Sequence, residues 1–226
     1  MMNREWRTLG RALLLAGACC LGGCAAVVVP AVIASAPELL ASAMRPFAFR
    51  SEFEEAATLI KARDWLGLST LARLKLEREP NRGEWWQVAG YGHMQAGEFV
   101  VARDCFARAT RLLPEEVSAW NLYAYTLART GDTRGAFAAV DRGLQTDPTS
   151  SQAWVLLGDL SAEAGRSREA VRAYDRALEI DKRDVFAWNG LGRLARRNGD
   201  KESLERAIKA LKQLYPAFAE ALEKPA

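Results

Sequence analysis

Residues 117–150 read VSAWNLYAYTLARTGDTRGAFAAVDRGLQTDPTS, and this stretch sets the period of the chain. Its tryptophan belongs to an evenly spaced series: Trp86, Trp120, Trp154 and Trp188. A glycine recurs at the same interval after each tryptophan (Gly97, Gly131, Gly165, Gly199), and so does a proline or, once, a lysine (Pro114, Pro148, Lys182, Pro216). A fixed period of about 20–50 residues is typical of solenoids, in which one supersecondary unit stacks on the next.

Each period predicts two helices joined by a tight turn. In residues 117–150 the first helix has an apolar face at helical spacing, formed by Trp120, Tyr123, Ala124 and Leu127. Gly131 suits the left-handed residue that closes a helix, and Thr133 is expected to cap the second helix. Pro148 ends that helix, because proline cannot continue one.

Small residues at equivalent positions predict close packing between the two helices of each repeat. They are Gly90, Ala124, Gly158 and Gly192 in the first helices, and Ala102, Ala136 and Ala170 in the second helices. The four periodic tryptophans are expected to be core residues of their repeats. Trp65 and Trp85 are less constrained by the repeat; packing is their expected role, and contact with a ligand is the alternative.

This order of large, small, glycine-turn, small, aromatic and proline positions resembles the consensus of the tetratricopeptide repeat (TPR) family. The resemblance implies an all-α, right-handed superhelix of about five helix-turn-helix units. The units are a degenerate copy at 49–82, with Glu52 in place of tryptophan, and then 83–116, 117–150, 151–184 and 185–218. Residues 219–226 are expected to be a C-terminal tail, and 217–222 at most a short solvating helix.

Composition and motifs argue against several classes of function. The net charge of +3 gives no field strong enough to indicate nucleic-acid binding. Three of the four cysteines lie in an N-terminal apolar run, which leaves Cys105 without an internal disulfide partner. The sequence has no phosphate-binding loop, HExxH or CxxC motif, and His93 is expected to be a packing or surface residue. We therefore expect no enzymatic activity, no metal and no cofactor.

The N-terminus is typical of a secretory signal. Basic residues precede the apolar run at 12–21, and the run ends in Leu21-Gly22-Gly23-Cys24. This ending resembles the bacterial lipobox, which implies a signal peptide at 1–24, cleavage before Cys24 and attachment of lipid to the Cys24 thiol. Ala25 in place of aspartate favours the outer membrane, with the repeats facing the periplasm. Residues 25–48 are expected to be a membrane-proximal linker, broken by three prolines.

An uncleaved anchor is the alternative for the same region. No charge occurs from Ala12 to Ala36, a stretch long enough to span a bilayer, which needs about 20 residues. A transmembrane segment of this kind would hold the repeats at the inner membrane, again outside the cytoplasm.

The concave surface of a stacked repeat array is the expected binding site. In TPR proteins the residues one, five, eight and nine positions after the tryptophan face this groove. By this resemblance the groove residues are Gln87, Tyr91, Met94, Gln95, Asn121, Tyr125, Ala128, Arg129, Val155, Asp159, Ala162, Glu163, Asn189, Arg193, Arg196 and Arg197. Asn121 and Asn189 occupy equivalent positions, where an amide can donate and accept along a peptide backbone. Arg193 and Arg197, with Arg129, are candidates to bind an acidic segment or terminal carboxylate, although a solvated helix face explains them equally well.

The sequence thus predicts a membrane-anchored scaffold that binds a protein or peptide. Among families, the chain resembles small TPR lipoproteins that support pilus assembly and secretion, including pilotins and tight-adherence pilus proteins. The alternative is an accessory chaperone for an envelope enzyme pathway, such as haem or cell-wall biogenesis. The oligomeric state and the partner stay open.

Overall fold

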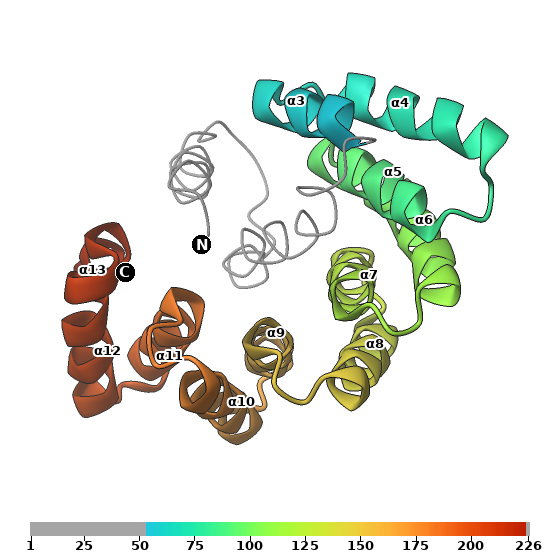
Figure 1. The fold of residues 1–226 in the computed structure, drawn as a ribbon. Coiled ribbons are helices and arrows are strands. Elements are labelled where there is room, and N and C mark those ends of the chain that lie inside the picture. The colour runs from blue at the N-terminus through green and yellow to red at the C-terminus, as the bar shows by residue number, and fades with distance from the viewer. Residues whose placement is uncertain (1–52, 225–226) are drawn as a thin grey trace.

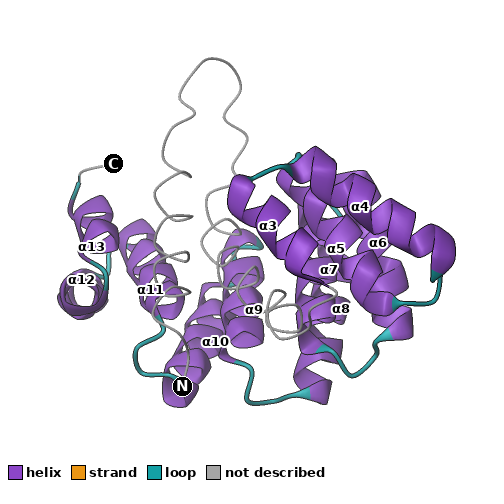
Figure 2. Ribbon diagram, turned by 45° about the horizontal axis from the view of Figure 1, so that its top comes forward, coloured by secondary structure: helices purple, strands orange, loops and turns teal. Residues whose placement is uncertain are grey.

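The computed structural model describes residues 53–224, which form helices and contain no strand. The helices are α3 (Glu54–Ala62), α4 (Trp65–Arg78), α5 (Gly83–Gln95), α6 (Phe99–Leu112), α7 (Val117–Arg129), α8 (Thr133–Thr146), α9 (Ser151–Glu163), α10 (Ser167–Ile180), α11 (Val185–Asn198), α12 (Lys201–Leu214) and α13 (Pro216–Glu223). Short loops join them (Figure 2). The all-α superhelix predicted from the sequence is confirmed.

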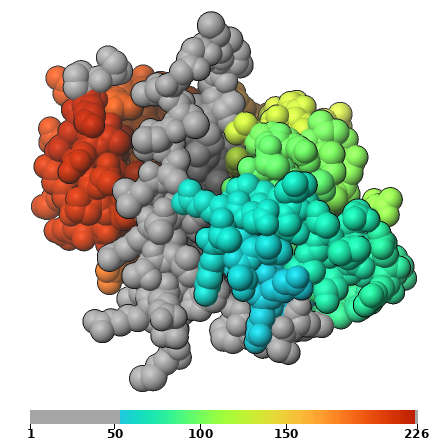
Figure 3. All heavy atoms as spheres, turned by 90° about the horizontal axis from the view of Figure 1, so that it is seen from above, coloured from blue at the N-terminus to red at the C-terminus, as the bar shows by residue number. Residues whose placement is uncertain are grey.

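The helix pairs follow one another along an arc. Figure 1 shows α7, α9 and α11 on the inner side of this arc, with α8, α10 and α12 on its outer side. Seen from above, the helices α3 to α6 and the helices α12 and α13 lie at opposite ends of the molecule (Figure 3). The first helices of successive repeats therefore form the concave surface.

The predicted glycine turns are present in all four regular repeats. Gly97, Gly131, Gly165 and Gly199 have φ angles of +82°, +88°, +73° and +73°, in the left-handed region that favours glycine. The cap after Gly131 differs from the prediction, because Asp132 and not Thr133 is the N-cap of α8. The Asp132 carboxylate accepts a hydrogen bond of 2.8 Å from the Gly135 N–H. A carboxylate reaches a free N–H of the first turn and also suits the positive end of the helix dipole.

The small residues allow large side chains of the second helices to approach the first helices. A Cβ placed on Gly90 would lie 2.8 Å from the Phe106 ring, and one on Gly158 would lie 2.5 Å from the Tyr174 ring. Both rings are fully buried. Glycine is therefore required at these two positions by packing.

The four periodic tryptophans are half-buried at the junctions between repeats, where they pack against the edge of the hydrophobic core. Each indole N–H donates a hydrogen bond to the backbone carbonyl six residues earlier. The acceptors are Pro80 (2.8 Å), Pro114 (2.8 Å), Pro148 (2.9 Å) and Lys182 (3.0 Å). An indole that packs against a protein core usually needs a hydrogen-bond acceptor for its N–H. Here the carbonyl of the preceding loop is that acceptor.

Trp85 lies in the core, which excludes the alternative of a contact residue and agrees with a packing role. Its side chain is 1% exposed, and its ring centroid lies 4.5 Å from that of Phe53. Trp65 is half-buried and meets Tyr91 edge-on, with the ring centroids 5.9 Å apart. Packing between the degenerate first unit and α5 explains both residues.

The C-terminal segment packs more closely than a solvating helix would. In α13 the side chains of Ala219 and Leu222 are buried. Leu222 covers the bare backbone of Gly192 in α11, and Phe218 lies against Phe186 with centroids 6.0 Å apart. Thus α13 takes the place that the first helix of a further repeat would occupy.

No helix in residues 53–224 combines the length and the apolar character needed to cross a membrane. The lipobox, Cys24 and the linker at 25–48 lie outside the described residues.

Candidate binding surface

Equivalent positions of α5, α7, α9 and α11 form three rows from repeat to repeat, and α7, α9 and α11 lie on the inner side of the arc (Figure 1). The first row is Gln87, Asn121, Val155 and Asn189. The second row is Tyr91, Tyr125, Asp159 and Arg193. The third row is Gln95, Arg129, Glu163 and Arg197. Members of neighbouring repeats meet within a row, since the Arg193 guanidinium lies 3.1 Å from the Asp159 carboxylate.

The first row contains buried amide atoms that have no hydrogen-bond partner in residues 53–224. Asn121 is 1% exposed, and neither its Nδ2 nor its Oδ1 has a hydrogen-bond partner within the described residues. The Gln87 Nε2 donates to the Ser118 Oγ at 3.3 Å, whereas its Oε1 has no partner in this part of the chain. A buried polar group without a partner costs about 1–3 kcal/mol, so a native protein keeps one for a reason. The unpartnered atoms of Asn121 and Gln87 are closed to solvent, and they mark these two residues as candidates for a polar contact with a ligand.

The second row is neutral and aromatic in its first half. Tyr91 and Tyr125 are buried, and burial raises the pKa of both phenols, so each stays uncharged at neutral pH. The Arg129 guanidinium of the third row stacks on the Phe99 ring, 4.2 Å from its centroid. The surface of α5 and α7 is therefore rich in amides and rings and poor in free charge.

The surface of α9 and α11 is charged, and its charges pair with one another. Asp159, 1% exposed, accepts a 2.7 Å hydrogen bond from the Tyr174 hydroxyl in addition to its ion pair with Arg193. Burial, followed by the nearby Asp159 carboxylate, raises the pKa of the Tyr174 phenol. Arg197 donates to the Ala162 carbonyl at 2.9 Å. An acidic ligand at this end would have to compete with Asp159 for Arg193.

The remaining predicted groove residues lie on the same helices. Asn189 is buried and Gln95 half-buried, each in its row, while Glu163 is exposed between Arg129 and Arg197. Sequence reasoning missed Tyr174 and Ser118, which contact the rows from outside them. The sequence alone does not reveal these contacts. By its position in the repeat, Tyr174 is expected to be a packing aromatic residue and Ser118 a residue at the start of a helix.

Catalytic and metal-binding groups are not assembled in the described residues. No cluster of three histidine, cysteine or acidic side chains suited to a metal occurs in residues 53–224. His93 Nδ1 lies 2.5 Å from the Glu98 carboxylate at the turn between α5 and α6, and both side chains reach solvent. Burial raises the pKa of the Cys105 thiol to about 11, which keeps it protonated and unreactive.

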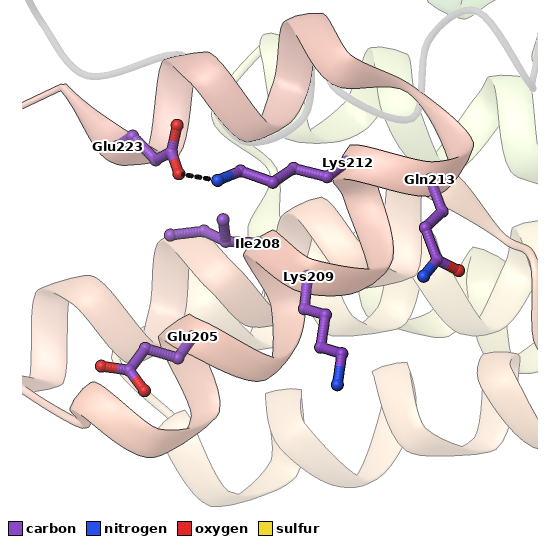
Figure 4. Close-up of a pocket in the computed structure, with 6 residues that line it drawn as sticks. All are labelled: Glu205, Ile208, Lys209, Lys212, Gln213 and Glu223. Atoms are coloured by element: carbon purple, nitrogen blue, oxygen red, sulfur yellow. Dashed lines mark ion pairs between the residues drawn. The ribbon is translucent and has the colours of Figure 1, made fainter.

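The hollow between α12 and α13 has no convergent chemistry either. It measures about 480 Å³ and is lined by Glu205, Ile208, Lys209, Lys212, Gln213 and Glu223. Lys212 and Glu223 form a 2.6 Å ion pair, and Figure 4 shows Glu205, Lys209 and Gln213 pointing in different directions. A site for proton transfer or nucleophilic attack needs such groups to point at one place.

Comparison with known proteins agrees with this geometry. Two family models, both described as tetratricopeptide repeat, match residues 88–151 and 127–196. No curated protein matches the sequence.

Solved structures share the fold at low identity. A crystal structure of MamA is 17% identical, with a TM-score of 0.62 over 73% of this chain and 96% of MamA. TTC0263, a TPR protein of Thermus thermophilus, is 16% identical, with a TM-score of 0.63 over 74% of this chain and 95% of its own. YrrB, described as a TPR protein with an unusual peptide-binding site, is 17% identical, with a TM-score of 0.58 over 84% of this chain and 96% of its own. With the fixed period and the glycine turns, these matches assign tetratricopeptide repeats to residues 88–196 and the fold of a tetratricopeptide-repeat superhelix to the described part of the chain.

Proposed function

We propose that this protein is a membrane-anchored scaffold that binds an extended segment of a partner protein along its concave surface. In this role it assists the assembly of a cell-envelope complex such as a pilus or secretion system. The observation that carries the binding proposal is the buried, unpartnered amide of Asn121 in α7. YrrB, which has a similar fold, is described as having a peptide-binding site, and this supports peptide binding as the role of this chain.

The rows define what such a segment looks like. An extended chain advances about 3.3 Å per residue and packed helices lie about 8–10 Å apart, so roughly three residues of the partner pass each first helix. Asn121 donates to and accepts from the partner backbone, with the Gln87 Oε1 as a further acceptor. Uncharged side chains suit the α5 and α7 end, and charged ones suit the α9 and α11 end.

Anchoring to the membrane would favour binding by raising the local concentration of the partner. A lipid on Cys24 would hold the binding surface at the membrane, where tethering raises the effective concentration of partners in the same complex. The uncleaved anchor at 12–36 would have the same effect at the inner membrane. The proposal of envelope localisation rests on the sequence of these residues, which lie outside the described part of the chain.

Asn121→Leu tests the groove. Because the amide has no partner to lose, we expect the variant to unfold at the same or a higher urea concentration, while binding to partners captured from envelope extract weakens about tenfold. Purified partners identified by mass spectrometry would then be titrated against the full chain in detergent. Asn198→Ala, at an exposed position at the end of α11, is the matched control. Unchanged affinity in Asn121→Leu would contradict the groove proposal.

Arg193→Glu and Arg197→Glu test the charged end in the same assay. Unaltered recovery of every partner would exclude this end from binding. The identity of the captured proteins also separates a scaffold of a pilus or secretion system from a chaperone of haem or cell-wall enzymes.

Radiolabelled palmitate tests the anchor. The label should enter the wild-type chain and be absent from Cys24→Ala. Label in the variant would refute the lipobox, and label in neither, with both chains in the inner membrane, would support the uncleaved anchor.

A further inference from the structure

A second hollow lies at the junction between the degenerate first unit and the first regular repeat. It measures about 270 Å³ and is lined by Pro80, Asn81, Trp86, Arg108, Arg111 and Leu112. These residues come from the loop before α5, the start of α5 and the last turns of α6. None of them belongs to the three rows of the concave surface.

The hollow carries two positive charges, those of Arg108 and Arg111. Arg108 lies over the Trp86 ring, 4.6 Å from its centroid, and the Arg111 Nε donates to the Ala107 carbonyl at 3.0 Å. Both arginines are exposed, and no carboxylate of residues 53–224 pairs with either. The end of the α6 dipole contributes only about half a negative charge here, so the hollow stays positive.

The floor of the hollow is apolar and fixed. The Trp86 ring is half-buried and held by its 2.8 Å hydrogen bond to the Pro80 carbonyl. Pro80 adds a rigid ring, and Leu112 is 37% exposed beside it. If an anionic group of a ligand enters the hollow, an apolar group next to it in the ligand would therefore contact this floor.

The equivalent junctions of the later repeats lack this combination. In the second repeat the positions of Asn81 and Arg111 are Glu115 and Gln145. In the third repeat Arg176 is paired with Glu179, which stands at the position of Arg111. In the fourth repeat the two arginine positions are Ala210 and Gln213. If the junction only packed the repeats together, all four copies would need the same residues. Packing therefore does not explain why the first copy has two arginines at these positions.

We propose that this hollow binds the C-terminal carboxylate of a partner protein whose last residue is apolar. Two guanidinium groups can hold one carboxylate through charge-assisted hydrogen bonds, while the apolar side chain packs on Trp86 and Leu112. The site is independent of the concave surface, so one partner can occupy each.

Fluorine NMR of the full chain in detergent, labelled with 5-fluorotryptophan, tests the proposal. The Trp86 resonance is assigned with Trp86→Phe. The probe is N-acetyl-leucine, which carries a carboxylate beside an apolar side chain, and N-acetyl-leucinamide is its neutral match. For a fragment of this size we expect saturation with a dissociation constant of about 1–10 mM. The carboxylate should shift the Trp86 resonance and leave that of Trp120 in place, whereas the amide should shift neither.

Charge variants give the second part of the test. Arg108→Gln and Arg111→Gln should each weaken binding about tenfold. Arg142→Gln, at the position of Arg108 in the next repeat, should leave it unchanged. If Arg108→Gln perturbs the indole by itself, Arg111→Gln decides, since Arg111 does not stack on it. No saturable shift, an equal response to the amide, equally strong binding of inorganic phosphate, or full affinity in both variants would each overturn the proposal.

Discussion

At the scale of single residues, Arg63 occupies the backbone position that glycine holds in the four regular turns. Its φ is +55°, and it stands one repeat period before Gly97. A side chain in the left-handed region costs about 1 kcal/mol, because its Cβ approaches the following carbonyl. The degenerate unit thus keeps the turn of a repeat without the residue that favours it.

Arg63→Gly should raise the free energy of unfolding by roughly 0.5–1 kcal/mol, since the relief of strain exceeds the extra flexibility of glycine in the unfolded chain. Urea denaturation followed by circular dichroism measures the change. Gly131→Ala is the reverse test and should cost about 1 kcal/mol. A loss of stability in Arg63→Gly would mean that the contacts of the Arg63 side chain outweigh the strain.

At the scale of elements, α13 closes the core at the C-terminal end. An apolar face exposed after the last regular repeat would be a liability, and terminal units of solenoids are expected to differ for this reason. Here Leu222 covers Gly192 of α11, while the exposed positions of α13 are glutamates, alanines and a proline, with no large apolar side chain. Both features follow from the position of α13 at the end of the stack.

Leu222→Ala should lower the free energy of unfolding by about 2–3 kcal/mol, because it removes a buried side chain and opens a cavity over Gly192. Thermal and urea unfolding of the full chain would show the loss. Glu220→Ala, on the exposed side of the same helix, should change stability by less than about 0.5 kcal/mol. Equal effects of the two substitutions would contradict a capping role for α13.

The elements also show what a sequence can and cannot predict. The helix pairs, the glycine turns and the close approach at Gly90 and Gly158 follow from local spacing, because sterics at one residue decide them. The half-buried setting of the periodic tryptophans depends on a carbonyl in the preceding loop, which spacing does not reveal. Likewise, the groove rows could be placed from the repeat, but the pairing of Arg193 with Asp159 required the distance between neighbouring repeats.

At the scale of the whole molecule, each repeat contacts mainly its neighbours along the arc (Figure 1). The stability of such a chain is approximately a sum of repeat and interface contributions. Helices in the middle have neighbours on both sides, whereas α3 and α13 lie at the two ends of the described stack. Local opening is therefore expected to begin at the ends.

Hydrogen exchange should show the slowest amides in α7 to α10 and the fastest in α3 and α13. Two matched core substitutions sharpen the test, because Leu156 and Leu211 are both fully buried. Each alanine variant should cost about 2–4 kcal/mol. Leu156→Ala should speed exchange on both sides of α9, and Leu211→Ala only in α11 to α13. A uniform increase in every helix for both variants would indicate one cooperative unit instead.

The bond from each indole to the loop before its own repeat has a consequence for how such a chain can lengthen. A duplicated block of one full repeat brings its own donor, and the backbone of the block before it supplies the acceptor. Because the acceptor is a main-chain oxygen, the side chain of the residue that carries it can change during evolution. Lys182, which replaces the proline of the other junctions, is an example. Gene duplication in whole repeats is thus tolerated at these junctions, whereas insertion of a single amino acid into a junction loop would separate donor from acceptor.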